Sequence, residues 1–239
     1  MILIAASLLP VVLLMAYFYY RDKFEKEPVK VLMKAFGAGI LSVFPAVLLA
    51  TLMSVPNIET YSPAYSSFIR AFWEAALPEE ICKFALLYLF IWRDRNFNEY
   101  YDGIIYAVFV SLGFAGVENI MYVVGEGIDV ALTRGLLSVP LHALCGVIMG
   151  YYFSLARFNT ARQKGYLLKA VAGAIIAHGL YDFILFYTDS LVGISTAFAG
   201  LGFLLVFVFI IYLWRFSLRK IRLHVDNSAF KNQANEDEV

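Results

Sequence analysis

Long apolar stretches separated by short polar segments dominate the pattern along this chain. Seven of them are long enough, at roughly 17–25 residues, to cross a bilayer as helices. They lie near residues 1–20, 34–55, 68–92, 102–124, 135–156, 169–188 and 193–215. Because backbone polar groups find no water in the hydrocarbon core, helix is the expected form. The pattern predicts an all-α fold, a polytopic membrane bundle of about seven transmembrane helices.

The two ends of the chain differ in character. The first stretch has no basic segment before it and no small-residue cleavage site before Arg21, so we expect a retained span rather than a signal peptide. Beyond residue 222 the chain turns polar and ends in NQANEDEV, a composition typical of disorder. We therefore expect one transmembrane domain at residues 1–222 and a disordered polar tail at 223–239.

Composition and charge add the environment and the orientation. The 239 residues are 61% hydrophobic and 16% charged, with a mean hydropathy of +0.71, as in an integral membrane protein. The formal net charge of zero gives no reason to expect a nucleic acid partner. Sixteen of the 19 Lys and Arg residues flank one side of the predicted spans, and only Arg70 and Arg134 flank the other. The positive-inside rule then predicts an external N-terminus and a cytoplasmic C-terminus.

Polar residues within the predicted spans gather on four consecutive helices. They are Glu74, Glu79, Glu80 and Lys83, then Glu118 and Asn119, then His142, then His178 and Asp182. Ionisable groups are costly in lipid and usually mark a functional site or a structural pair. At about 1.5 Å per residue, the candidate site residues lie about 9–15 Å from the outer ends of their spans. This overlap predicts one water-accessible site in the outer half of the bilayer.

The segment PEEICKF carries two adjacent carboxylates. Glu79 and Glu80 point about 100° apart on a helix. Lys83 is four residues after one and three after the other, within reach of either. A buried ion pair with Lys83 accounts for one glutamate and leaves the other glutamate without a charged partner. A glutamate without a partner in such a place is a candidate general base.

The other polar positions have both a structural and a catalytic interpretation. His178 and Asp182 share a helix face, and an aspartate that orients a histidine is a recurrent catalytic arrangement. The alternative is a structural pair that holds two helices together. Glu118 and Asn119 could likewise form hydrogen bonds that hold neighbouring helices together.

Four short segments occur in order on successive spans: EEICK, FAGVE followed by Asn119, the region of His142, and HGLYD. Together they resemble the PrsW family of glutamic-type intramembrane proteases, over residues 72–183. That family is similar to the CAAX prenyl endopeptidases and the bacteriocin-immunity membrane proteases. Here Glu118 stands where those enzymes have a histidine, and Lys83 stands near where they have an arginine. Both differences favour the PrsW branch.

The resemblance implies an intramembrane endopeptidase of the bacterial inner membrane. It implies a first, site-1-type extracytoplasmic cut in a single-pass anti-sigma factor under envelope stress, after which a second intramembrane protease cuts the remnant. The expected partners are this substrate, membrane lipid and the downstream protease, with no nucleic acid. Two other functions stay open, a non-catalytic scaffold like the Aph subunit of γ-secretase and a proton-coupled transporter.

The resemblance also suggests roles for the residues. The expected catalytic set is Glu79, Glu80, Glu118, His142 and His178, supported by Lys83, Asn119 and Asp182. Glu79 is the first choice as the general base that activates water, and Glu80 would pair with Lys83 or orient a partner.

The remaining roles concern the water and the scissile carbonyl. Glu118 would hold the water or bond a histidine, His142 and His178 would polarise the carbonyl, and Asp182 would orient His178. No HExxH motif is present, so no cofactor is expected. Zinc held by the histidines and carboxylates is the alternative.

Overall fold

The computed structural model of this chain describes residues 2–22, 24–192 and 195–226. Within these ranges every regular element is a helix, which confirms the all-α prediction. The long helices are α1 (Ile2–Arg21), α2 (Val29–Met53), α4 (Leu77–Ile91), α5 (Tyr100–Glu126), α7 (Ser138–Phe158), α8 (Gln163–Leu191) and α9 (Thr196–Asp226). The short ones are η1 (Ile58–Thr60), α3 (Pro63–Phe68), η2 (Ile69–Ala76), α6 (Ile128–Leu136) and η3 (Thr160–Arg162).

The membrane-spanning segments agree with the predicted bundle. Six helical segments of the described chain are long and apolar enough to cross a membrane. The remaining predicted span, at 68–92, is also helical, because α3, η2 and α4 follow one another without a break. Its charged residues make it less apolar than the others. The protein is therefore a polytopic helix bundle of about seven long helical segments.

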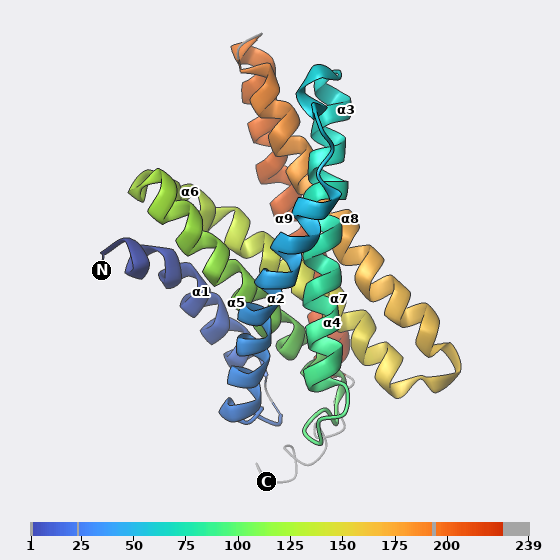
Figure 1. Cartoon of the computed structure of the whole chain (residues 1–239). Coiled ribbons are helices and arrows are strands. Elements are labelled where there is room, and N and C mark those ends of the chain that lie inside the picture. Colours follow the sequence, from blue (N-terminus) through green and yellow to red (C-terminus); the bar gives the residue numbers. More distant parts are fainter. Residues whose placement is uncertain (1, 23, 193–194, 227–239) are drawn as a thin grey trace.

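The bundle has two ends (Figure 1). The connections at residues 24–28, 92–99 and 159–162 lie at one end, which we call the basic end. The turn at 54–62 leads into α3 at the opposite end, which we call the α3 end. The last turns of α8 also reach the α3 end (Figure 1).

Helices α5 and α7 form the centre of the bundle. Every residue at 101–116 and at 141–150 is buried, as expected for helices that are apolar on all sides. The GxxxG spacing of Gly146 and Gly150 predicts close helix packing. A Cβ on Gly150 would come 2.3 Å from the carbonyl oxygen of Gly103, which confirms that prediction. These contacts bring the backbones of α5 and α7 close together and fix how their polar side chains face each other.

The helical segment that carries PEEICKF changes its winding just before the two glutamates. Residues of η2 form a π-helix, in which the N–H of Leu77 bonds the carbonyl of Phe72, five residues earlier. Pro78 has no N–H to donate to the carbonyl of Glu74, so an ordinary α-helical bond is impossible there. The sequence predicts a kink at this place, and the structure shows a π turn there, which is one of the recognised causes of a kink.

Some helix ends in the structure differ from the predicted boundaries. The fifth span was placed at 135–156, but residues 128–136 form the separate helix α6, and α7 begins at Ser138. The polar tail was expected to begin at residue 223, but α9 continues to Asp226. There His224 stacks on Tyr151 with ring centroids 4.3 Å apart, which holds the last turn of α9 against α7. The predicted disorder of 227–239 lies outside the described residues.

Candidate active site

The eight residues singled out from the sequence come from four helices and form one continuous polar cluster. They are Glu79, Glu80 and Lys83 on α4, Glu118 and Asn119 on α5, His142 on α7, and His178 and Asp182 on α8. Glu74 does not belong to it. Its carboxylate accepts a 2.6 Å hydrogen bond from the N–H of Val55 and so ties η2 to the end of α2.

Lys83 lies at the centre of the cluster. Its Nζ donates to Glu79 Oε2 at 3.1 Å and to Glu80 Oε1 at 2.8 Å, and it lies 3.0 Å from Nδ1 of His142. The ring of Phe114 lies beneath the ammonium group, 4.0 Å from Nζ to the centroid. The lysine side chain is completely buried, so these groups replace its water shell.

The two adjacent glutamates have different surroundings. Glu80 is completely buried, and its Oε1 also lies 2.8 Å from Nδ1 of His178. Glu79 keeps 17% of its side chain exposed, and its Oε2 is 3.9 Å from the same ring nitrogen. Glu80 is therefore held by two close partners, whereas Glu79 has one close partner and one side that faces a cavity.

Each site histidine is held at both ring nitrogens. His178 meets Glu80 at Nδ1 and Asp182 at Nε2, the second at 3.2 Å. His142 lies 2.8 Å from Glu118 through Nε2 and faces Lys83 at Nδ1. Because an ammonium group can only donate, Nδ1 of His142 accepts and Nε2 carries the hydrogen that Glu118 receives.

Arg134 on α6 is a member of the site that sequence reasoning missed. Its NH2 group lies 2.9 Å from Glu118 Oε1, and its Nε donates to Asn119 Oδ1 at 3.2 Å. The Asn119 amide in turn donates to the carbonyl of Ser7 on α1. Arg134 was counted only as a loop residue, although it is one of two basic residues on the side predicted to be external. That rarity was the signal that could have identified it.

The side chains enclose a small cavity of about 80 Å³. Its polar lining consists mainly of Glu79, Glu118, Arg134, His142, His178 and Asp182. Lys83 and Glu80 lie behind this surface. The cavity therefore exposes one carboxylate of the glutamate pair to whatever enters it.

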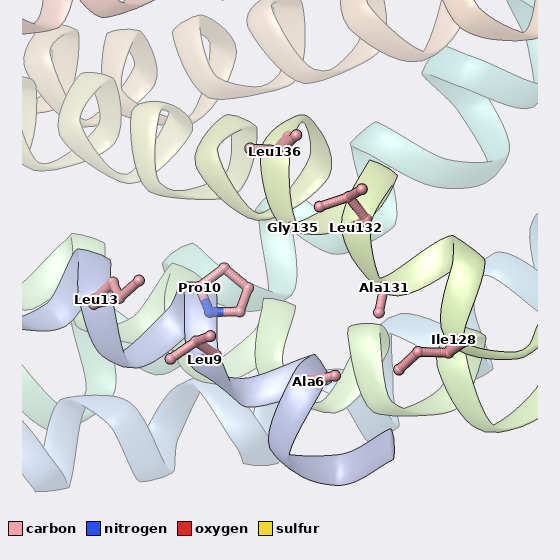
Figure 2. A pocket seen from close by; sticks show the side chains of 9 residues that line it. All are labelled: Ala6, Leu9, Pro10, Leu13, Ile128, Ala131, Leu132, Gly135 and Leu136. Atoms are coloured by element: carbon pink, nitrogen blue, oxygen red, sulfur yellow. The ribbon is translucent and has the colours of Figure 1, made fainter. Parts of the chain in front are cut away.

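A second cavity, of about 350 Å³, lies between α1 and α6 (Figure 2). Its nine lining residues are all apolar or glycine, and they include Leu9 and Pro10 on α1 and Leu132 and Leu136 on α6. None of them lines the small polar cavity, which we call the catalytic cavity because it holds the predicted catalytic residues. This apolar groove is therefore separate from the polar site.

A second buried group of carboxylates lies at the basic end and was not foreseen. Asp22, Glu27 and Asp102 are almost completely buried, and Tyr106 donates to Glu27 Oε2. Asp102 Oδ2 accepts from the N–H groups at the start of α5. Burial raises the pKa of Asp22 and of Glu27 to about 7. This group joins the loop between α1 and α2 to α5, far along the helices from the catalytic cavity.

Four side chains of the site offer atoms that could bind a metal ion. One atom each from Glu79, Glu80, His142 and His178 lies within 4.8 Å of the others. Imidazole and carboxylate are ligands that zinc accepts. However, the ammonium group of Lys83 already lies about where such an ion would sit, 2.8–3.1 Å from three of the four. The types of donor fit a metal, but their arrangement around Lys83 does not.

Comparison with known proteins gives the family. Residues 27–214 match the family described as PrsW family intramembrane metalloprotease. This chain belongs to the PrsW family. It is 36% identical to Protease PrsW of Bacillus subtilis (strain 168) over 222 residues, 92% of this chain and 94% of that protein. It is 37% identical to Protease PrsW of Geobacillus kaustophilus (strain HTA426) over 220 residues, 92% of this chain and 91% of that one. No solved structure matches.

Membership of the PrsW family confirms the resemblance read from the four segments. The protein is a multi-pass bacterial membrane protein and a membrane-embedded endopeptidase, which acts on a membrane-protein substrate. The family description includes a metal; the cluster of glutamates and histidines has donor types that suit one, but Lys83 lies among these donors.

Proposed function

We propose that this PrsW-family protein makes the first, extracytoplasmic cut in a single-pass membrane anti-sigma factor, with water activated by Glu79. The observation that carries this mechanism is the exposure of Glu79 to the cavity, while its neighbour Glu80 is enclosed. A general base must reach the water from which it takes a proton. Glu79 is the glutamate of the pair that can do so.

A balance of charges supports the same choice. The site has four carboxyl groups, Glu79, Glu80, Glu118 and Asp182. Because Nδ1 of His142 accepts from Lys83 and that ring is neutral, three groups are left to carry positive charge, Lys83, Arg134 and His178. Buried charges are stable only when they are paired. Within the glutamate pair, Glu80 has two partners at 2.8 Å, whereas Glu79 has one close partner, Lys83 at 3.1 Å. Glu79 is therefore the glutamate of the pair that is better able to accept and return a proton.

The chemical step follows from these positions. Glu79 takes a proton from a water molecule, and the water oxygen attacks the carbonyl carbon of the scissile bond. The tetrahedral intermediate carries negative charge on the former carbonyl oxygen. When the C–N bond breaks, Glu79 returns the proton to the leaving nitrogen. Lys83 stabilises Glu79 in its charged form, and Glu80 keeps Lys83 in place.

The oxyanion needs a donor that already faces the cavity. His178 is suited to this role because its bond to Asp182, at 3.2 Å, is the weaker of its two contacts and both residues line the cavity. An incoming carbonyl oxygen could replace Asp182 as the acceptor. Glu118 and His142 hold each other on the opposite wall, where Glu118 could bind the attacking water.

We further propose that this reaction uses no metal ion. Lys83 supplies the positive charge at the centre of the carboxylates, and a divalent cation there would be repelled by the ammonium group.

The orientation of the bundle in the membrane decides on which side the cut is made. With the basic end in the cytoplasm, the α3 end faces outward and the cut is extracytoplasmic. A second intramembrane protease would then act on the remnant.

Co-expression in a heterologous bacterium with candidate single-pass anti-sigma factors tests the proposal. The substrate is followed by immunoblot at matched membrane levels of wild type, Glu79→Gln/Glu80→Gln and Glu126→Gln. Glu126 is an exposed glutamate at the end of α5, outside the cluster. We expect a shortened product with wild type and Glu126→Gln and none with the double variant. A product that persists with the double variant would rule out the glutamate mechanism.

A further inference from the structure

The catalytic cavity is too small to hold a substrate in its present form. Its 80 Å³ has room for only about three water molecules, at about 30 Å³ each. Sites that bind organic ligands are usually several times larger, at about 300–1,000 Å³. A polypeptide must therefore reach Glu79 through an adjoining space that already exists or that opens.

A larger cleft adjoins the cavity on its α3 side. It measures about 550 Å³ and lies between the segment of α3 and η2 and the last turns of α8. Ala75 and Phe186 line both the cleft and the catalytic cavity, so the two spaces share a wall. Ala75 is four residues before Glu79 on the same helical segment. The shared wall is therefore directly above the proposed base.

The chemistry of this cleft suits a polypeptide backbone. Arg70 on η2 and Asp189 on α8 contribute both signs of charge. Ser66 and Ser190 donate to carbonyls of their own segments and contribute hydroxyl oxygens as acceptors. An extended peptide brings unpaired N–H and C=O groups, which need hydrogen-bond partners when they leave water. Charged side chains and hydroxyls supply both donors and acceptors.

The apolar groove between α1 and α6 is an alternative place for the substrate (Figure 2). It has no polar side chain to pair with a peptide backbone, and it shares no lining residue with the catalytic cavity. Arg134, on the same helix α6, lines the catalytic cavity and pairs there with Glu118, and it does not line the groove. A lipid chain or an intact helix suits this groove better than a peptide in extended form.

We propose that the cleft lined by Ser66, Arg70, Asp189 and Ser190 binds an extended segment of the substrate next to the scissile bond, and that Ala75 and Phe186 form the narrow passage to Glu79. This inference rests on the proposed protease function. The peptide enters from the α3 end, where an unwound juxtamembrane segment is available. Phe186 is only half-buried, so its ring has room to move aside.

Blocking the cleft by thiol labelling tests the proposal. Ser190→Cys and Thr60→Cys are made in the full-length protein and labelled with a bulky maleimide, and cleavage of a substrate that wild type cuts is measured. Thr60 is exposed in η1 and does not line the cleft. Cys82 and Cys145 are buried, and labelled wild type controls for any reaction there. We expect labelling to lower kcat/KM at least tenfold for Ser190→Cys and less than twofold for Thr60→Cys.

Two outcomes distinguish failure of the proposed cleft from failure of the proposed protease function. Absence of cleavage by unlabelled wild type with every substrate counts against the protease function itself. Cleavage that labelled and unlabelled Ser190→Cys perform equally overturns the cleft while leaving the protease function intact.

A photo-crosslinking residue gives an independent measurement if the cysteine variant does not fold. It is placed at Ser190 or at Leu132 in the Glu79→Gln background, which retains substrate. We expect a substrate adduct from position 190. An adduct from position 132 alone assigns entry to the apolar groove and overturns the proposal.

Discussion

Glutamine at position 79 and glutamine at position 80 should have different effects, although the two residues are neighbours. Glu80 is fully buried and bonds both Lys83 and His178 at 2.8 Å. Glu79 faces the cavity and has one close bond, to Lys83 at 3.1 Å. We expect Glu80→Gln to reduce stability and activity together, and Glu79→Gln to reduce activity with little effect on stability.

The magnitudes follow from these contacts. Each hydrogen bond to a charged group contributes about 1.5–3 kcal/mol, and breaking a buried ion pair costs about 3–5 kcal/mol. Glu80→Gln removes the charge from two such bonds and should lower the free energy of unfolding by about 3–5 kcal/mol. Glu79→Gln leaves Lys83 paired with Glu80 and should cost about 1 kcal/mol. Loss of a general base lowers the rate by about 10²–10⁴.

The assay combines thermal unfolding in detergent with single-turnover cleavage of one substrate. Glu126→Gln serves as the matched control and should equal wild type in both measurements. Equal unfolding temperatures for Glu79→Gln and Glu80→Gln would refute the difference in burial on which the reasoning depends. Wild-type cleavage by Glu79→Gln would refute its assignment as the base.

Three other measurements test separate parts of the structure. Chelation with metal removal confirmed by elemental analysis should leave cleavage unchanged, whereas loss restored by zinc would contradict the role of Lys83. Burial raises the pKa of Asp22 and Glu27 from 3.8 and 4.5 to about 7. Between these pH values the folded state therefore binds more protons than the unfolded state. Stability should therefore decline from about pH 4 to pH 7, and Asp22→Asn/Glu27→Gln should flatten that decline; an unchanged slope contradicts it. Gly150→Ala should destabilise by about 1–3 kcal/mol, whereas Gly165→Ala, with open space around it, should not; equal unfolding temperatures would contradict the close α5–α7 packing.

The meeting of the polar residues could be predicted from the sequence because a helix converts residue number into depth. A constant rise places residues of different spans at comparable heights once the spans are known. His178 and Asp182 also share a face by their spacing alone. The structure shows that they contact each other, and that His178 in turn contacts Glu80.

The elements that the sequence did not predict are those where hydropathy is uninformative. Helix α6 is short and carries the polar residues Asp129, Thr133 and Arg134, so it resembles a loop between two spans. Gly127 precedes it with φ of +100°, a conformation that favours glycine and separates α6 from α5. The contact of Arg134 with Glu118 depends on this turn, and no periodicity within one helix reveals it.

The buried carboxylates at the basic end show a related limit. Asp22 and Glu27 lie in a short connection with several charged neighbours, which is typical of a solvated loop. Their burial depends on Asp102 and Tyr106, about 80 residues further along the chain. Contacts between such distant segments follow from the packing of the helices, which hydropathy does not specify.

The segment PEEICKF meets two requirements that conflict with each other in a membrane. A catalytic carboxylate must be free enough to exchange a proton, yet a buried charge must be paired. Two glutamates that point about 100° apart meet both needs when one lysine lies a turn further on. Lys83 pairs with Glu80 in the interior and still reaches Glu79 at the cavity wall. The ion pair with Glu80 holds Lys83 in place, and Lys83 in turn keeps Glu79 charged. A single glutamate paired with the same lysine would not be free to act as a base.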